Sequence, residues 1–195
     1  MNVDWLGLAT IAVGGDAAAA FLLKVGVSGQ LVMDLNGNIG AILSLEAGGG
    51  TPSVGAVWTL AMTNAERIFD LSGIGFSCGG SVSVAGASGG VEFISGTAKD
   101  GTNVTGGMVV WGYSAVPPLW AEGHGQFTAS TVVSLNWIGE DLKKEAIDIM
   151  DKAFNSLPID VQEALLNSIV PTNKKGLTKN KITFTGGVKI ESAPI

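Results

Sequence analysis

One stretch of the sequence places several side chains suited to acid–base chemistry on alternate positions. The members of this polar stripe are Glu122, His124, Gln126, Thr128 and Ser130, which in a β-strand would share one face. His124 is the chain's only histidine, and a carboxylate two residues away would favour its protonated form and suit it to general base catalysis. Neither a nucleophile nor an oxyanion hole can be paired with the stripe. A water-facing strand is therefore the simpler interpretation, and a hydrolase using Glu122 and His124 is an alternative.

Other reactive residues are sparse. Cys78 is the only cysteine, so no intrachain disulfide is possible, and its phase with neighbouring valines predicts a small buried hydrophobic residue. A nucleophilic pair of Cys78 with His124 is an alternative. Residues 34–38 resemble the start of a calcium loop but lack the later bidentate glutamate. We therefore expect neither a metal nor a cofactor.

Aromatic residues gather near the connection that contains two adjacent prolines. Trp111, Tyr113 and Trp120 flank this connection, and together with Gln126 they are candidate binding residues for a carbohydrate or a lipid. Aromatic side chains also commonly fill the end of a small barrel, which is the alternative interpretation.

Composition changes sharply between Gly139 and Glu140. Residues 1–139 contain three cations, nine carboxylates and 26 of the 29 glycines, whereas the last 56 residues contain eight cations, eight carboxylates and three glycines. The first pattern is typical of β-sheet and the second of helices. We therefore predict a glycine-rich antiparallel β-barrel-like domain over 1–139, an amphipathic helical hairpin packed on it over 140–171, and a basic loop with a terminal strand over 172–195.

The first part predicts a mainly β fold. About eight strand-length runs, spaced by roughly 10 to 15 residues, favour an antiparallel meander that forms a barrel or a sandwich. We expect a first strand at 5–13 with a turn at 14–16, a hairpin at Asn36-Gly37-Asn38, a helical turn capped by Thr63 or Asn64, and a turn at Lys99-Asp100-Gly101.

The second part predicts two helices and a strand. Apolar residues recur at helical spacing from Glu140 to Phe154, and again between Pro158 and Pro171. Residues 182–190 then alternate apolar with polar side chains, which predicts a half-buried strand that returns to the main sheet as an edge with outward lysines.

Charge excludes some partners. The net charge is −6 and Arg67 is the sole arginine, which argues against nucleic acid because neutralising phosphates requires clustered cations. The apolar N-terminus carries Asp4 where a signal peptide would have basic residues, so we interpret it as strands and expect no signal peptide in this chain. A secreted or cell-surface protein is favoured over a cytoplasmic one, with export after loss of a leader or within a larger chain.

The segment 27–73, VSGQLVMDLNGNIGAILSLEAGGGTPSVGAVWTLAMTNAERIFDLSG, resembles glycine-rich C-terminal modules of bacterial Rhs/YD-repeat and other polymorphic-toxin-like proteins. The likeness extends over about 25–130 and rests on Asp-x-Asn-Gly-Asn, a glycine-rich strand and a later Asp-Leu-Ser-Gly. It implies a bacterial, exported module and assigns no catalytic residue. The chain lacks a repeat shell, and its helices lie outside the pattern.

These observations favour a non-enzymatic binding module for a protein partner or a small apolar or glycan ligand. The alternative is a membrane-active or pore-forming effector, since the β-part is apolar and poor in charge. Against it, Asp16, Asp34, Glu46 and Glu92 interrupt the apolar runs, and a spanning barrel would require all four to face its lumen. Alternation alone does not select the inward face, because both faces of the strands are apolar.

Overall fold

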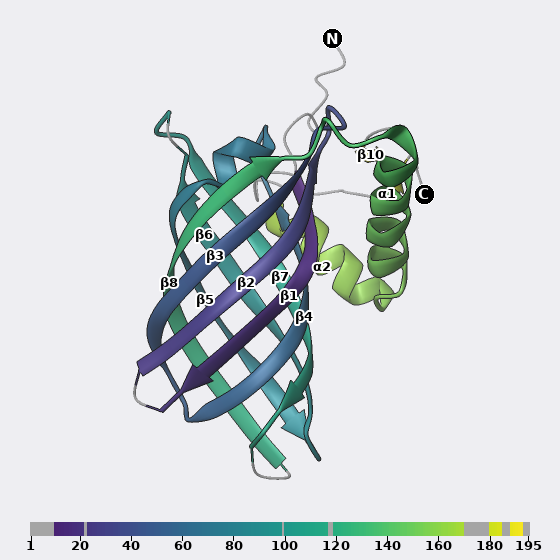
Figure 1. Cartoon of the computed structure of the whole chain (residues 1–195). Coiled ribbons are helices and arrows are strands. Elements are labelled where there is room, and N and C mark those ends of the chain that lie inside the picture. Colours follow the sequence, from purple (N-terminus) through teal and green to yellow (C-terminus); the bar gives the residue numbers. More distant parts are fainter. Residues whose placement is uncertain are drawn as a thin grey trace.

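The computed structural model describes residues 10–21, 23–98, 100–116, 119–169, 180–184 and 188–192 of the 195-residue chain. Eight antiparallel strands close into a barrel (Figure 1), which confirms the predicted fold class. The strands are β1 (Thr10–Ala20), β2 (Leu23–Asp34), β3 (Ile39–Gly50), β4 (Ser53–Thr63), β5 (Gly73–Val84), β6 (Ala87–Thr97), β7 (Asn103–Ser114) and β8 (Leu119–Ser134).

The barrel consists of two interlocked Greek keys. The strand order is β1-β2-β3-β8-β5-β6-β7-β4, closed by pairing of β4 with β1. Sequential hairpins connect β1 to β3 and β5 to β7, whereas β4 returns beside β1 and β8 returns beside β5. Each set of four strands therefore has the spatial order 4-1-2-3 of a Greek key. Closure leaves no strand with an unpaired edge.

The turns divide between two ends of the barrel. Connections β1–β2, β3–β4, β5–β6 and β7–β8 lie at the end that we call lower, and β2–β3, β4–β5 and β6–β7 lie at the upper end. The predicted hairpin at 36–38 is confirmed, with Gly37 at a φ of 78°. The turn predicted at 14–16 is wrong, because these residues lie inside β1, and the chain turns only after Ala20.

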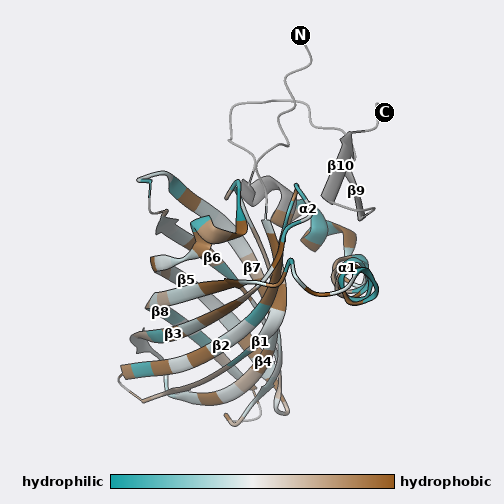
Figure 2. Ribbon diagram, turned by 45° about the horizontal axis from the view of Figure 1, so that its top comes forward, coloured by the Kyte–Doolittle hydropathy of each residue, from teal (hydrophilic) through white to brown (hydrophobic). Residues whose placement is uncertain are grey.

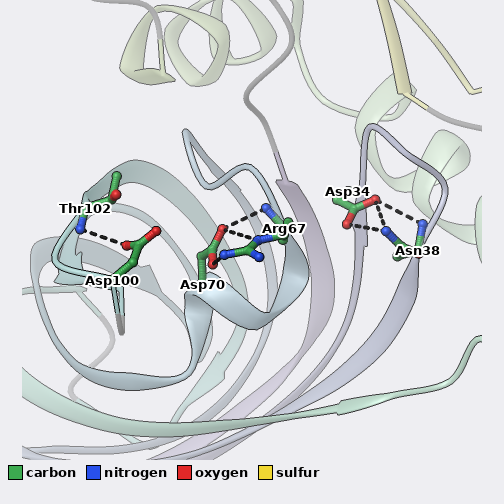
Figure 3. A network of polar contacts seen from close by, with 6 residues as sticks. All are labelled: Asp34, Asn38, Arg67, Asp70, Asp100 and Thr102. Carbon is green, nitrogen blue, oxygen red and sulfur yellow. Dashed lines mark hydrogen bonds and ion pairs between the residues drawn. The ribbon is translucent and has the colours of Figure 1, made fainter.

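Polar contacts fix the upper turns (Figure 3). The Asn38 side-chain amide donates to Asp34 at 2.9 Å, and the Arg67 guanidinium lies 3.0 Å from the Asp70 carboxylate. The Arg67–Asp70 hydrogen bond raises the pKa of Arg67. Asp100 accepts from the backbone N–H of Thr102, which lowers the pKa of Asp100.

The connection between β4 and β5 contains the short 3₁₀ helix η1 (Ile68–Leu71), which lies at the upper mouth of the barrel. Its N-cap is Arg67, so a helical turn is present as predicted but a cap at Thr63 or Asn64 is wrong. Ile68 is fully buried and packs with inward-facing Val32 and Ala12. An apolar cluster therefore lines the barrel beneath η1.

Two helices, α1 (Glu140–Asn155) and α2 (Ile159–Ile169), form the predicted hairpin beside the barrel (Figure 1). α1 contacts β1, and α2 contacts β4 and β7. Met150 and Phe154 pack on outward-facing residues of the upper wall, including Ile11 and Leu60. The hairpin therefore covers one side of the upper barrel. Among the described helices, none is both long and apolar enough to cross a membrane.

The C-terminal strands do not join the barrel. β9 (Asn180–Phe184) and β10 (Val188–Ser192) pair only with each other as a two-stranded antiparallel sheet. The single edge strand predicted for 182–190 is therefore wrong, because the eight barrel strands already pair with one another in a closed ring. The loop predicted before these strands lies outside the described residues.

A close approach of strands makes one inward glycine necessary. A Cβ added to Gly14 would collide with the carbonyl oxygen of Gly29 on β2, whereas a Cβ added to Gly29 would meet only Leu43 Cδ2 at 3.7 Å. We therefore expect Gly14→Ala to lower the free energy of unfolding by about 1 to 3 kcal/mol, in the range of overpacking. Gly29→Ala, its control on the adjacent strand, should be neutral or slightly stabilising. Urea unfolding measures both, and equal losses would contradict the close approach.

Candidate functional site

The charged residues of the barrel strands all face the interior. Side chains alternate between the two faces of each strand, and the buried or partly buried polar positions share the inward phase. These residues are Asp16, Lys24, Asp34, Glu46, Glu92 and Glu122. Four of these carboxylates interrupt the apolar runs in the sequence: Asp16, Asp34, Glu46 and Glu92. All four thus occupy inward positions of their strands, as a membrane-spanning barrel would require.

The polar stripe on β8 also faces inward, so the prediction that water covers it as the outer face of a strand is wrong. Gln126 is 1% exposed, and its side-chain N–H donates to Glu46 Oε2 at 2.8 Å. Glu122 accepts a hydrogen bond of 2.6 Å from Ser81 on β5. The stripe is therefore one wall of a polar interior that also includes residues of β3 and β5.

His124 is part of this interior. Its Nε2 lies 2.9 Å from Glu92 Oε1, and the two side chains are 8% and 3% exposed. The pair is an ion pair whenever the imidazole is protonated. Ser81 hydrogen-bonds Glu122, and within the part of the chain that the structure describes no hydroxyl or thiol is hydrogen-bonded to His124 Nε2. The geometry suits charge compensation inside the barrel better than catalysis on an external substrate.

Several buried polar atoms of the interior lack a partner. They include one carboxylate oxygen each of Asp16, Glu92 and Glu122 and the amide oxygen of Gln126. Lys24 is near enough to interact electrostatically with Asp16, Glu46 and Glu92. Negative groups outnumber positive ones here. Within the described residues, no three His, Cys, Asp or Glu side chains are arranged to hold a metal ion.

The structure separates the candidate binding residues onto two faces. Trp111 and Tyr113 on β7 are in the outward phase, whereas Trp120 and Gln126 on β8 are in the inward phase. The four therefore do not form one binding site. Trp111 lies directly opposite Trp58 on β4, a residue of the outer face that is 61% exposed.

Cys78 is on the outer wall of β5 and is only half-buried, so the prediction of a buried core residue is wrong. It is paired in register with Gly125 and Phe93. Because His124 faces the interior, the two side chains lie on opposite faces of the barrel. This placement is incompatible with a Cys78–His124 nucleophilic pair.

The outer wall is apolar and largely bare. No Asp, Glu, Lys or Arg occupies an outward position on any of the eight described barrel strands. In Figure 2, α1 is mostly hydrophilic, in contrast to the many hydrophobic positions along the strands. Large exposed apolar side chains lie on seven strands: Leu23, Val25, Val27, Leu43, Leu45, Val54, Trp58, Ile74, Phe76, Val82, Val84, Val91, Phe93, Tyr113, Leu119, Phe127 and Val133. β1 presents Ala17 and Ala19 instead.

Sequence reasoning missed this apolar wall, although a signal for it was present. Within each strand that contains a charged residue, most of the bulky apolar residues stand in the opposite phase, although some, such as Val32, Ile42 and Ile94, share the phase of the charges. In β2, for example, Lys24 alternates with Leu23 and Val25. For each strand, comparing how many charged and how many bulky side chains fall on the odd-numbered and on the even-numbered positions would have identified the inward face.

The contribution of the Glu92–His124 contact to stability can be compared with that of a more exposed ion pair whose charged atoms are equally far apart. Lys143 Nζ also lies 2.9 Å from Glu140 Oε1, with the glutamate 88% exposed. In urea unfolding, a double-mutant cycle with Glu92→Gln and His124→Gln should give a coupling of about 1 to 3 kcal/mol. The corresponding cycle with Glu140→Gln and Lys143→Gln should give less than about 0.5 kcal/mol, because water screens it. Similar couplings would show that the interior pair does little to balance charge.

Comparison with known proteins adds one structural neighbour. No family model matches the chain, and no curated protein matches it. The virulence-associated protein VapB from the intracellular pathogen Rhodococcus equi aligns with 63% of this chain and 95% of its own, at 15% sequence identity and a TM-score of 0.34. A similarity this low carries no argument, and the resemblance to polymorphic-toxin modules stays an expectation.

Proposed function

We propose that this protein is a non-enzymatic β-barrel that inserts its outer wall into the hydrocarbon of a lipid bilayer. The observation that carries this proposal is the inverted polarity of the barrel: every charged residue of its eight strands has the inward phase, and their outward positions carry no charged residue. A membrane barrel requires an apolar band on its outside and accommodates polar groups inside.

The dimensions of the strands support this function. Each barrel strand has between 11 and 16 residues, and a tilted strand needs about 9 to 11 to cross a bilayer. Closure of the ring also matters, because hydrocarbon offers no partner for an unpaired backbone N–H or C=O. The eight strands meet both conditions without a further subunit.

The two ends of the barrel differ in charge, which supports insertion of the lower end. The lower connections, residues 21–22, 51–52, 85–86 and 115–118, contain no charged residue in the sequence. Phe21, Leu23, Tyr113 and Leu119, near that end, are each at least 75% exposed. The upper turns instead carry charged groups such as Arg67 and Asp70 (Figure 3). Moving the lower end into hydrocarbon therefore removes no charged loop from water.

A bilayer fits the wall better than a protein partner does. A protein that docks on a barrel covers one side, whereas exposed apolar side chains here lie on strands around the whole ring. A bilayer surrounds a barrel on all sides. We therefore take up the membrane-active alternative of the sequence analysis in place of a binding module for a protein partner or a small ligand.

An open pore receives less support. A barrel of eight strands has an interior just wide enough for side chains or one small ligand. Here Lys24, Glu46, Glu92 and Gln126 occupy part of it and are at least 92% buried. We therefore expect membrane insertion of this barrel without release of large solutes.

Leu45→Glu tests the proposal. Leu45 is 66% exposed on the bare wall of β3, and Leu142, on α1, is 55% exposed and provides the matched control. A carboxylate on a lipid-facing strand opposes burial in hydrocarbon, so Leu45→Glu should lower the fraction that co-sediments with liposomes by about tenfold, equivalent to about 1.4 kcal/mol. Leu142→Glu should leave that fraction within about twofold of wild type.

The native thiol provides a second measurement on the unaltered chain. Cys78 is on the outer wall, so reaction with a water-soluble maleimide should slow markedly when liposomes are added. An unchanged rate together with an absence of co-sedimentation would overturn the proposal. If light scattering then showed a stable oligomer that protects the thiol in water, the wall would be an interface between copies of this chain instead.

A further inference from the structure

The upper half of the barrel interior contains a cavity that the proposed function does not use. Its volume is about 120 Å³, and it extends from beneath η1 to Glu46 and Gln126. Asp70 and Leu71 line its upper side. A cavity of about 150 Å³ is known to accept benzene, so this one has room for several waters or for a ligand of about six non-hydrogen atoms.

Two polar groups that line the cavity have unused hydrogen-bonding capacity. Gln126 is 1% exposed, and its Oε1 accepts no hydrogen bond, because only its amide N–H is engaged, with Glu46. Ser77 is 4% exposed, and its Oγ, which interacts with Glu92, keeps its acceptor lone pairs free. An unpaired buried acceptor costs about 1 to 3 kcal/mol, so a bound donor would be stabilised at this point.

The charges of the surrounding side chains indicate which class of hydrogen-bond donor the cavity would bind. The carboxylates of Asp16, Glu46, Glu92 and Glu122 share the interior with the cations Lys24 and His124, the latter only when protonated. Of these carboxylates, Glu46 is the one that lines the cavity. Burial and the neighbouring Asp16 raise the pKa of Glu46 to about 7, so a positively charged ligand beside Glu46 would stabilise its ionised form.

The remaining lining supplies apolar contacts. Ile42, Ala61 and Met108 line the same cavity as Glu46. Each is at least 93% buried. A ligand with a charged head at Glu46 and Gln126 would therefore place a short hydrocarbon chain against these three residues.

We infer that the cavity binds a small alkylammonium ion, with the ammonium hydrogen-bonded to Glu46 and Gln126 and the alkyl chain beside Met108. An ammonium carries three N–H donors, which suits a carboxylate, an amide oxygen and the Ser77 hydroxyl together. This site lies inside the barrel and does not depend on the proposed role of the outer wall.

Three probes of similar size test the inference on the wild-type protein: n-butylammonium, 1-butanol and butyrate. Titration is followed by the NMR signals of the methionine methyl groups, with Met108 assigned by Met108→Leu. We expect saturable shifts of the Met108 methyl with n-butylammonium, about tenfold weaker binding of 1-butanol, and no binding of butyrate. No shift with any probe, meaning that the cavity holds only water, would overturn the inference. Equal binding of butyrate would also overturn it.

Two isosteric variants test which carboxylate binds the ammonium group. Glu46→Gln should weaken n-butylammonium binding by about tenfold. Glu122→Gln removes another interior carboxylate that does not line the cavity and should leave affinity within about twofold. Equal losses would contradict a site at Glu46. If Glu46→Gln fails to fold, Ser77→Ala replaces it and should cost about threefold, while the wild-type probe series still decides the inference.

Discussion

The placement of six charged side chains inside a closed ring of eight strands constrains the rest of this structure. Asp34 is held by the upper turn, whereas the other five lie in a barrel too narrow to hold much water and depend on one another and on His124 for compensation. Lys24 lies among Asp16, Glu46 and Glu92, and His124 contacts Glu92 directly. With all strand charges held inside, the outer face is left with aliphatic, aromatic and small residues. The polar interior and the apolar outer wall thus both follow from which alternate positions of each strand face inward.

Glycine makes this arrangement of inward and outward positions sterically possible. Strands that wind tightly around a crowded interior approach one another closely at inward positions, where a Cβ on Gly14 or Gly48 would meet the backbone of the next strand. Packing thus explains these inward glycines, whereas others, such as Gly29 and Gly89, have room for a Cβ. At Gly48 the neighbouring strand is β8, and on the same two strands Ser44 lies 2.8 Å from its register partner Ser130, which is 86 residues away in the sequence. The glycines therefore support contacts between strands that are distant along the chain.

The sequence predicted features that depend on local chemistry. The hairpin at Asn36-Gly37-Asn38 follows from residues that tolerate positive φ, and the helix that begins at Glu140 follows from its apolar period. The turn predicted at 14–16 was wrong because Gly14 and Gly15 serve strand packing instead. The inward face of the polar stripe was also missed. The pairing of β8 with β3 and β5 fixes which face points inward, and β8 taken alone is ambiguous because bulky residues such as Val132 and Val133 occupy both phases.

The helical hairpin adds a constraint along the barrel axis. Met150 and Phe154 cover part of the upper wall, so hydrocarbon cannot reach Ile11 or Leu60 while α1 is in place. The other side of α1 carries charged residues, among them Lys143, whose burial in lipid would be costly. The wall free of both helices and charged turns is the lower part of the ring. If the barrel enters a bilayer as proposed, the hairpin and the upper turns would limit how deeply it inserts, and the cavity beneath η1 would lie close to the end that stays in water.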